Sequence, residues 1–155
     1  MWNKIKPYVY WIAGTLLVGV LAAFLTRGNM EFYETINKPT LAPPGSWFPV
    51  VWTILYILMG IGAALIYIKG SGEQRFCALR LYVIQLIFNF LWTIVFFNFR
   101  WFLFAFIWLM ILWVLIIAMI VKFYKISPAA AYMQIPYLLW VTFAAYLNFM
   151  IYLLN

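Results

Sequence analysis

The chain has 155 residues, of which 69% are hydrophobic and 8% are charged, with no histidine and one cysteine. Soluble domains average about half apolar and a quarter charged residues, so this composition excludes a water-soluble fold and indicates that lipid is the main solvent. It also excludes a His-ligated metal or haem centre, a Ser-His-Asp triad and an intramolecular disulfide.

Five apolar runs are each long enough to cross the roughly 30 Å hydrocarbon core as a helix. We predict membrane-spanning helices over about 8–26, 48–68, 79–98, 101–122 and 131–153. The runs are continuous rather than alternating, which argues against transmembrane strands. The predicted fold class is an all-α integral membrane protein, a single domain over residues 1–155. It is a five-transmembrane-helix bundle with a long loop between its first two helices.

Local motifs mark some of the helix boundaries. Ser127 followed by Pro128 predicts a capped helix start, and Ser46 before Pro49 predicts a similar start for the second helix. Pro136 lies deeper in the last run and predicts a kink. The first run is longer than the apolar core of a signal peptide and four more spans follow, so we interpret it as a retained helix.

The basic residues lie at the ends of the apolar runs and form no cluster, which argues against nucleic-acid binding. Seven fall on the N-terminal side of the membrane and three on the opposite side (Lys4, Lys6, Lys69, Arg75, Arg80, Lys122 and Lys125 against Arg27, Lys38 and Arg100). The positive-inside rule then predicts a cytoplasmic N-terminus in a bacterial plasma membrane, with the 27–47 loop and the C-terminus outside.

Polar side chains within the spans should face the bundle interior, because they are costly in lipid. Three helices each carry a stripe that mixes aromatic and hydrogen-bonding groups (Trp52, Tyr56, Met59 and Ala63; Gln85, Asn89, Trp92 and Phe96; Tyr137, Trp140, Ala144 and Asn148). Such stripes are typical of an apolar ligand pocket with a few orienting polar atoms. The amides could equally serve only as hydrogen bonds between helices.

Tryptophans near the ends of spans are typical of the interfacial aromatic belt, which is our interpretation of Trp2, Trp47 and Trp101. Trp52 and Trp140 differ because each lies within a span, on a stripe that contains polar groups. Arg100 lies in the tight turn between the third and fourth helices. It is either an interfacial anchor or a partner for a ligand carboxylate.

A series of motifs carries a family resemblance. They are, in order, Phe32-Tyr33, Lys38-Pro39, Pro43-Pro44-Gly45, Phe48-Pro49-Val50-Val51-Trp52, Leu55-Tyr56 and Met59-Gly60; then Gln85, Asn89, Trp92, Phe96-Phe97 and Arg100; then Pro136-Tyr137-Leu138, Trp140, Phe143-Ala144 and Leu147-Asn148. In this order and spacing, over about residues 8–153, the chain resembles a bacterial member of the tryptophan-rich sensory protein (TspO/MBR) family. The family is also called translocator protein or peripheral-type benzodiazepine receptor.

The resemblance implies a five-helix bundle that is usually a homodimer. It implies binding of porphyrins and related tetrapyrroles, of sterols in some members, and of synthetic isoquinoline carboxamides and benzodiazepines. No cofactor is required, and porphyrin is a ligand. The pocket opens toward the first loop, which acts as a lid. Carried over by position, the ligand-binding residues are Trp52, Tyr56, Asn89, Trp92, Phe104, Tyr137, Trp140, Ala144 and Leu147, with Pro43, Pro44 and Gly45 in the lid.

The chain departs from the family at three places. Leu41 stands where the family usually has tryptophan, and Ser46 stands where a tryptophan follows the position of Gly45. The last helix has no basic residue to complete the sterol-associated motif, so cholesterol binding of the animal type is not expected.

A loop with prolines at 39, 43, 44 and 49 loses little entropy when it closes over a flat ligand. Lys38 within it could attract propionates or be a solvated charge.

No histidine or intramembrane carboxylate offers a general base. The leading hypothesis is therefore a tetrapyrrole receptor, with a role in transport less favoured because no inverted repeat is evident. A scaffold role explains the tryptophan stripes poorly. The alternative is a catalyst of light- and oxygen-dependent porphyrin degradation, for which Trp52 and Trp140 are the catalytic candidates.

Overall fold

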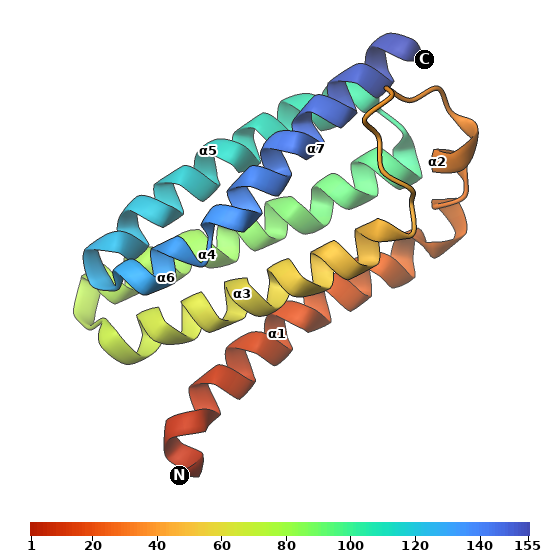
Figure 1. Ribbon diagram of the computed structural model, residues 1–155. Coiled ribbons are helices and arrows are strands. Elements are labelled where there is room, and N and C mark those ends of the chain that lie inside the picture. The colour runs from red at the N-terminus through yellow and green to blue at the C-terminus, as the bar shows by residue number, and fades with distance from the viewer.

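A computed structural model describes all 155 residues, and its secondary structure is entirely helical. The elements are α1 (Trp2–Thr26), the short η1 (Arg27–Asn29), α2 (Phe32–Thr35), α3 (Trp47–Lys69), α4 (Gly72–Thr93), the π-helical η2 (Ile94–Phe99), α5 (Phe102–Ile126), α6 (Pro128–Tyr132) and α7 (Ile135–Leu154) (Figure 1). Five helical segments are long and apolar enough to cross a membrane, which confirms the predicted five-helix bundle.

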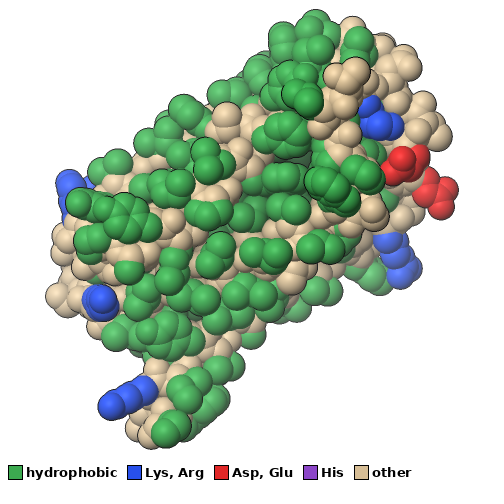
Figure 2. All heavy atoms as spheres, in the orientation of Figure 1, with side chains coloured by type: hydrophobic (Ala, Val, Ile, Leu, Met, Phe, Trp, Pro, Cys, Tyr) green, Lys and Arg blue, Asp and Glu red, His purple; other side chains and the backbone are tan.

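The outer surface of the bundle is apolar. Only 39 of the 155 residues are buried, so most of the hydrophobic side chains are at least partly exposed. Figure 2 shows these side chains covering the flank of the bundle, with basic side chains toward its ends and acidic ones beside the loop. Exposed apolar patches of this extent are rare on soluble monomers. The chain is an integral multi-pass membrane protein.

Several helices are longer than the apolar runs predicted. α3 agrees with its prediction to one residue at each end, but α1 begins at Trp2 instead of 8 and α4 begins at Gly72 instead of 79. α5 likewise extends to Ile126 instead of 122. The reason is that hydropathy marks the hydrocarbon core, whereas a helix continues into the headgroup region through residues that are charged but good helix formers.

The boundary motifs had mixed outcomes. The Ser127 cap is confirmed, because its hydroxyl oxygen accepts a hydrogen bond from the Ala130 N–H at 3.3 Å. The Ser46 cap is wrong: this residue precedes α3, but its side chain caps no amide. The kink predicted at Pro136 is confirmed as a break between α6 and α7, just before the proline. Proline has no N–H to donate and its ring crowds the preceding turn.

The cavity of the protein is created by how α3 packs. α3 packs along α1 and also contacts α6, whereas it makes little contact with α7 (Figure 1). At Gly60 a Cβ atom would lie 2.6 Å from the Cα of Ile12, so the two helices meet backbone to backbone there. Toward the loop end α3 and α7 separate, and α4 lies behind the space between them.

Candidate functional site

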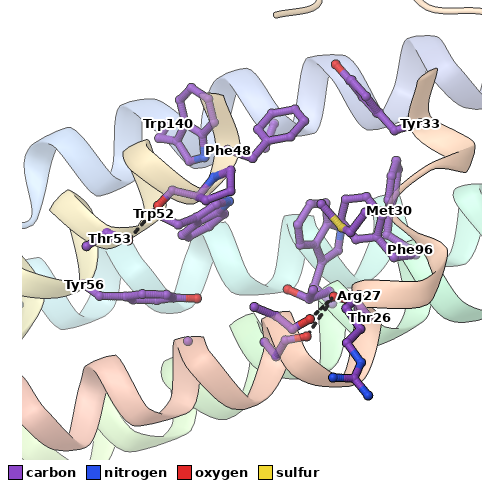
Figure 3. Close-up of a pocket in the computed structure, with 18 of the residues that line it drawn as sticks. Thr26, Arg27, Met30, Tyr33, Phe48, Trp52, Thr53, Tyr56, Phe96 and Trp140 are labelled. Atoms are coloured by element: carbon purple, nitrogen blue, oxygen red, sulfur yellow. Dashed lines mark hydrogen bonds between the residues drawn. The ribbon is translucent and has the colours of Figure 1, made fainter. Parts of the chain in front are cut away.

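The space between the helices is a cavity of about 390 Å³ at the loop end of the bundle. Its walls come from α1, α3, α7 and the end of α4 with η2, and Tyr33 of α2 lies at its outer end (Figure 3). The volume is within the range of roughly 300–1,000 Å³ typical of small-molecule sites. Figure 2 shows a recess in the apolar surface beside the loop, on the side where α3 and α7 separate.

Two tryptophans form one wall of the cavity. The ring centroids of Trp52 and Trp140 are 6.5 Å apart and their planes are almost perpendicular, at 89°. Phe48 extends this wall, with its ring centroid 6.0 Å from that of Trp140. Neither the Trp52 nor the Trp140 indole N–H has a hydrogen-bond partner, whereas the Trp92 N–H donates to Asn148 at 3.1 Å. Two indole donors therefore remain free at the cavity for an acceptor on a ligand.

A buried hydrogen-bond network fixes the inner end of the cavity. The Tyr56 hydroxyl donates to Asn89 Oδ1 at 3.2 Å, and Asn89 Nδ2 donates to the Tyr137 hydroxyl at 2.8 Å. The Tyr137 hydroxyl in turn donates to Gln85 Oε1 at 2.7 Å. Asn89 and Tyr137 are not wall residues, so the helix-joining interpretation of these polar groups applies to them. They hold the Tyr56 ring in place, and Tyr56 is in the wall.

Six residues expected in the pocket line the cavity: Trp52, Tyr56, Trp92, Trp140, Ala144 and Leu147. Phe104 does not. Its side chain is 48% exposed on the outer surface of α5, beside Trp101 and Trp108. The inward face of α5 instead carries Ala105 and Leu109, and a residue directly before Ala105 on a helix points about 100° away from it.

The predicted lid residues lie beside the cavity without lining it. Pro43 is buried and its carbonyl accepts a hydrogen bond from the Tyr33 hydroxyl at 2.9 Å. Pro44 is exposed, and the Gly45 N–H donates to the Glu34 carboxylate at 3.3 Å. The loop thus holds Tyr33, and Tyr33 contacts the cavity.

Charges near the loop serve to fasten it. The Lys38 ammonium donates to the carbonyls of Tyr33 and Ile36, so it is engaged within the loop and does not point at the cavity as a free cation. Burial, with a smaller effect of the Glu34 carboxylate, raises the pKa of Tyr33 to about 12. The Tyr33 hydroxyl therefore stays protonated, and able to donate to Pro43, at any physiological pH.

The sequence interpretation missed the contribution of α1. Eight wall residues come from α1 and the segment after it: Leu16, Gly19, Val20, Ala22, Ala23, Thr26, Arg27 and Met30. A signal for them was present, because Gly19, Ala22, Ala23 and Thr26 are small residues spaced at helical periods. A stripe of small residues lets a neighbour come close, and here it admits the Tyr56 ring at Gly19 and borders the cavity beyond it.

The ionisable groups of the cavity wall are few: Arg27, Tyr33 and Tyr56, with no carboxylate, histidine or cysteine. In Figure 3 the Arg27 guanidinium points away from the cavity. The wall is otherwise apolar and aromatic. This arrangement favours binding through shape and ring contact, and it supplies no acid–base pair.

The chain matches the TspO/MBR family over residues 7–154. It is 39% identical over 137 residues to the "Tryptophan-rich protein TspO" of Chlorobaculum tepidum, covering 86% of this chain and 85% of that protein. It is 36% identical over 146 residues to the protein of the same name from Archaeoglobus fulgidus (93% and 94% covered). It is 31% identical over 143 residues to the human "Translocator protein" (91% and 85% covered).

Proposed function

The chain belongs to the TspO/MBR family, and we propose that it is a membrane receptor for tetrapyrroles such as protoporphyrin IX and for similar flat lipophilic ligands. The observation that carries the proposal is the apolar cavity with two perpendicular indoles whose N–H groups are free. Aromatic faces supply contact area to a macrocycle at low rotamer cost. The indole N–H groups would donate to an acceptor oxygen, for which the propionates of a porphyrin are suited.

The size of the cavity bears on how such a ligand enters. A volume of about 390 Å³ is near the lower end of the range for ligand sites, and a tetrapyrrole is a large ligand. Val20, Pro49 and Thr53 line the cavity and are also exposed on the outer surface. Part of the macrocycle would therefore extend through this open side, or the loop would move outward to admit it. The proposal includes the synthetic isoquinoline carboxamide and benzodiazepine ligands and the homodimer that the resemblance implies.

Substituting the two cavity tryptophans tests the proposal. Trp52→Phe and Trp140→Phe each keep an aromatic ring but remove an indole N–H and ring area, so each should weaken binding of protoporphyrin IX by about tenfold, or roughly 1.4 kcal/mol. Binding is followed by the change in porphyrin absorbance on titration of the purified protein. This readout does not depend on tryptophan fluorescence.

The matched control is Trp113→Phe, because the Trp113 N–H donates to Thr142 and this residue is not in the cavity wall. The control should bind as the unaltered protein does. Unchanged circular dichroism confirms that each variant is folded. If both cavity variants bind protoporphyrin as tightly as the control, the cavity is not the site.

The pair of indoles also favours a second candidate function, the light- and oxygen-dependent degradation of bound porphyrin. In this hypothesis the excited porphyrin is the photosensitiser, dioxygen is the oxidant and the indoles are nearby electron donors, while the protein supplies positioning. Illuminated protein with protoporphyrin in air should give a new product spectrum, and the Trp52→Phe, Trp140→Phe double variant should not. Equal bleaching by both proteins would mean photochemistry in which the protein takes no part.

A further inference from the structure

A second hollow lies at the loop end of the bundle, between the start of α5 and the end of α7. We call it the α5–α7 groove. It is open, has a volume of about 790 Å³ and shares no wall residue with the cavity described above. Its walls are Arg100, Trp101, Phe102, Leu103, Phe104, Tyr152, Leu153 and Asn155. Phe104, which was expected in the ligand cavity, belongs to this groove.

Arg100 is the charged group of the groove, and its backbone position is fixed. It ends η2 in the left-handed conformation, with φ 56° and ψ 30°. Its guanidinium carbon lies 4.4 Å from the centroid of the Phe32 ring, which is buried and packs against Phe97 and Phe102. The Arg100 backbone N–H donates to the Val95 carbonyl, but its side chain makes no hydrogen bond and no salt bridge. The Arg100 guanidinium therefore lies on a buried aromatic ring and keeps all of its N–H donors free.

The other walls combine apolar surface with one further donor. Trp101, Phe104 and Leu153 are each between 48% and 58% exposed on the flank that faces lipid. The Tyr152 hydroxyl has no hydrogen-bond partner and the residue is 39% exposed. Arg100 itself lies between the two spans that end at Phe99 and begin at Phe102, so it is at the level of the membrane interface. The groove therefore offers a cation and a hydroxyl at headgroup level, beside an apolar surface that continues into the membrane.

From this arrangement we propose that the α5–α7 groove binds an anionic phospholipid, with its phosphate at Arg100 and Tyr152 and an acyl chain along Trp101, Phe104 and Leu153. Arginine matches a phosphate in charge and in the geometry of its donors. No Asp or Glu side chain lines the groove to compensate the charge of Arg100. A zwitterionic lipid would bring its own cation close to the guanidinium, so a lipid with net negative charge is favoured.

The test measures lipid retention by the full chain. Purified protein in detergent micelles is titrated with dioleoyl phosphatidylglycerol or dioleoyl phosphatidylcholine, and bound lipid is counted by native mass spectrometry. The unaltered protein should retain one phosphatidylglycerol in preference to phosphatidylcholine. Arg100→Asn should weaken that retention by about tenfold, which corresponds to one lost charge-assisted contact. Asparagine tolerates the left-handed conformation, so the substitution does not strain the turn. Arg100→Lys keeps the charge without the planar donors, so its retention of phosphatidylglycerol should be intermediate between those of the unaltered protein and Arg100→Asn.

The matched control is Arg27→Gln. Arg27 is also exposed at the loop end and also lies over an aromatic ring, that of Phe24 at 4.3 Å, but it is outside the groove. Its loss removes the same charge and should leave phosphatidylglycerol retention unchanged. Equal loss in the Arg27 and Arg100 variants would overturn the proposal in favour of general surface electrostatics. Equal retention of the two lipids, or no effect of Arg100→Asn, would also overturn it. Protoporphyrin binding by Arg100→Asn should be normal, and a loss there instead of in lipid retention would assign Arg100 to the other site.

Discussion

Single glycines decide how closely α1 and α3 approach, and therefore where the cavity begins. At Gly60 an added Cβ would meet the backbone of Ile12, and at Gly19 it would meet the Tyr56 ring. Gly14, on the same helix as Gly19, has nothing within 4 Å of an added Cβ. The same substitution should thus have opposite consequences at different positions. Of these three glycines, only Gly60 is blocked by backbone, which cannot turn aside as a side chain can.

Gly60→Ala should destabilise the protein, by roughly 1–3 kcal/mol, because the overpacked helices must move apart. Gly14→Ala should be neutral or stabilising by up to about 1 kcal/mol, since alanine is the better helix former and meets no neighbour. Thermal unfolding of both variants in the same detergent measures the difference. A Gly60 variant as stable as the Gly14 variant would show that the α1–α3 contact is looser than the structure has it.

The loop over residues 36–46 is the element that determines access to the cavity. It is attached to the end of α7 through two asparagines: the Asn37 N–H donates to Asn155 Oδ1 at 3.2 Å, and Asn155 Nδ2 donates to the Asn37 carbonyl at 2.9 Å. The Asn37 side chain adds a bond to the Leu154 carbonyl at 3.2 Å. All three bonds are exposed, so each is weak and the loop can detach without unfolding the bundle.

Asn155→Ala should speed the release of bound protoporphyrin by about fivefold, because two of these bonds are lost at a net cost of about 1 kcal/mol. Stopped-flow displacement of the porphyrin measures the rate. Thr40→Ala is the control, since Thr40 is an exposed residue of the same loop that forms no such bond. A rate equal to that of the control would show that the ligand leaves by the open side of the cavity and not past the loop.

At the scale of the whole molecule, five spans place the two ends of the chain on opposite sides of the membrane (Figure 1). The uneven distribution of basic residues, seven against three, predicts which of these two sides is the cytoplasmic one. The cavity and the α5–α7 groove lie at the end with fewer cations. The positive-inside rule predicts that this end faces away from the cytoplasm.

Reporter fusions test this orientation. Alkaline phosphatase, which is active only outside the cytoplasm, should be active when fused after Asn155 and inactive when fused before Met1. A fluorescent protein that matures only in the cytoplasm should give the reverse pattern at the two ends. The opposite pattern for both reporters would place the loop and the cavity on the cytoplasmic side.

The spans and the inward stripes could be predicted from the sequence because hydropathy and helical periodicity are local properties. Five of the six expected wall residues lie on these stripes, whereas Leu147 was expected only from the family resemblance. A helix in lipid must bury its polar groups, so Gln85, Asn89 and Asn148 identify inward faces without any knowledge of neighbours. The helix ends were predicted less well, since hydropathy reports the hydrocarbon core and not the hydrogen-bonded helix. The wrong Ser46 cap has a similar cause: its position fits, but the backbone there is already helical, so its side chain does not bond the next turn.

Only the tertiary structure decided which inward-facing residues form walls and which form the network behind them. Asn89 and Trp92 share one helical face, yet Asn89 holds two tyrosines while Trp92 lines the cavity. The tertiary structure also placed Phe104 outside the cavity and the α1 residues in its wall, because both placements depend on helix rotation and on the separation of α3 from α7. Periodicity is a property of one helix, whereas a hollow is a property of the distances between several. The sequence alone thus determined what each helix turns inward, and the packing determined where those faces leave space.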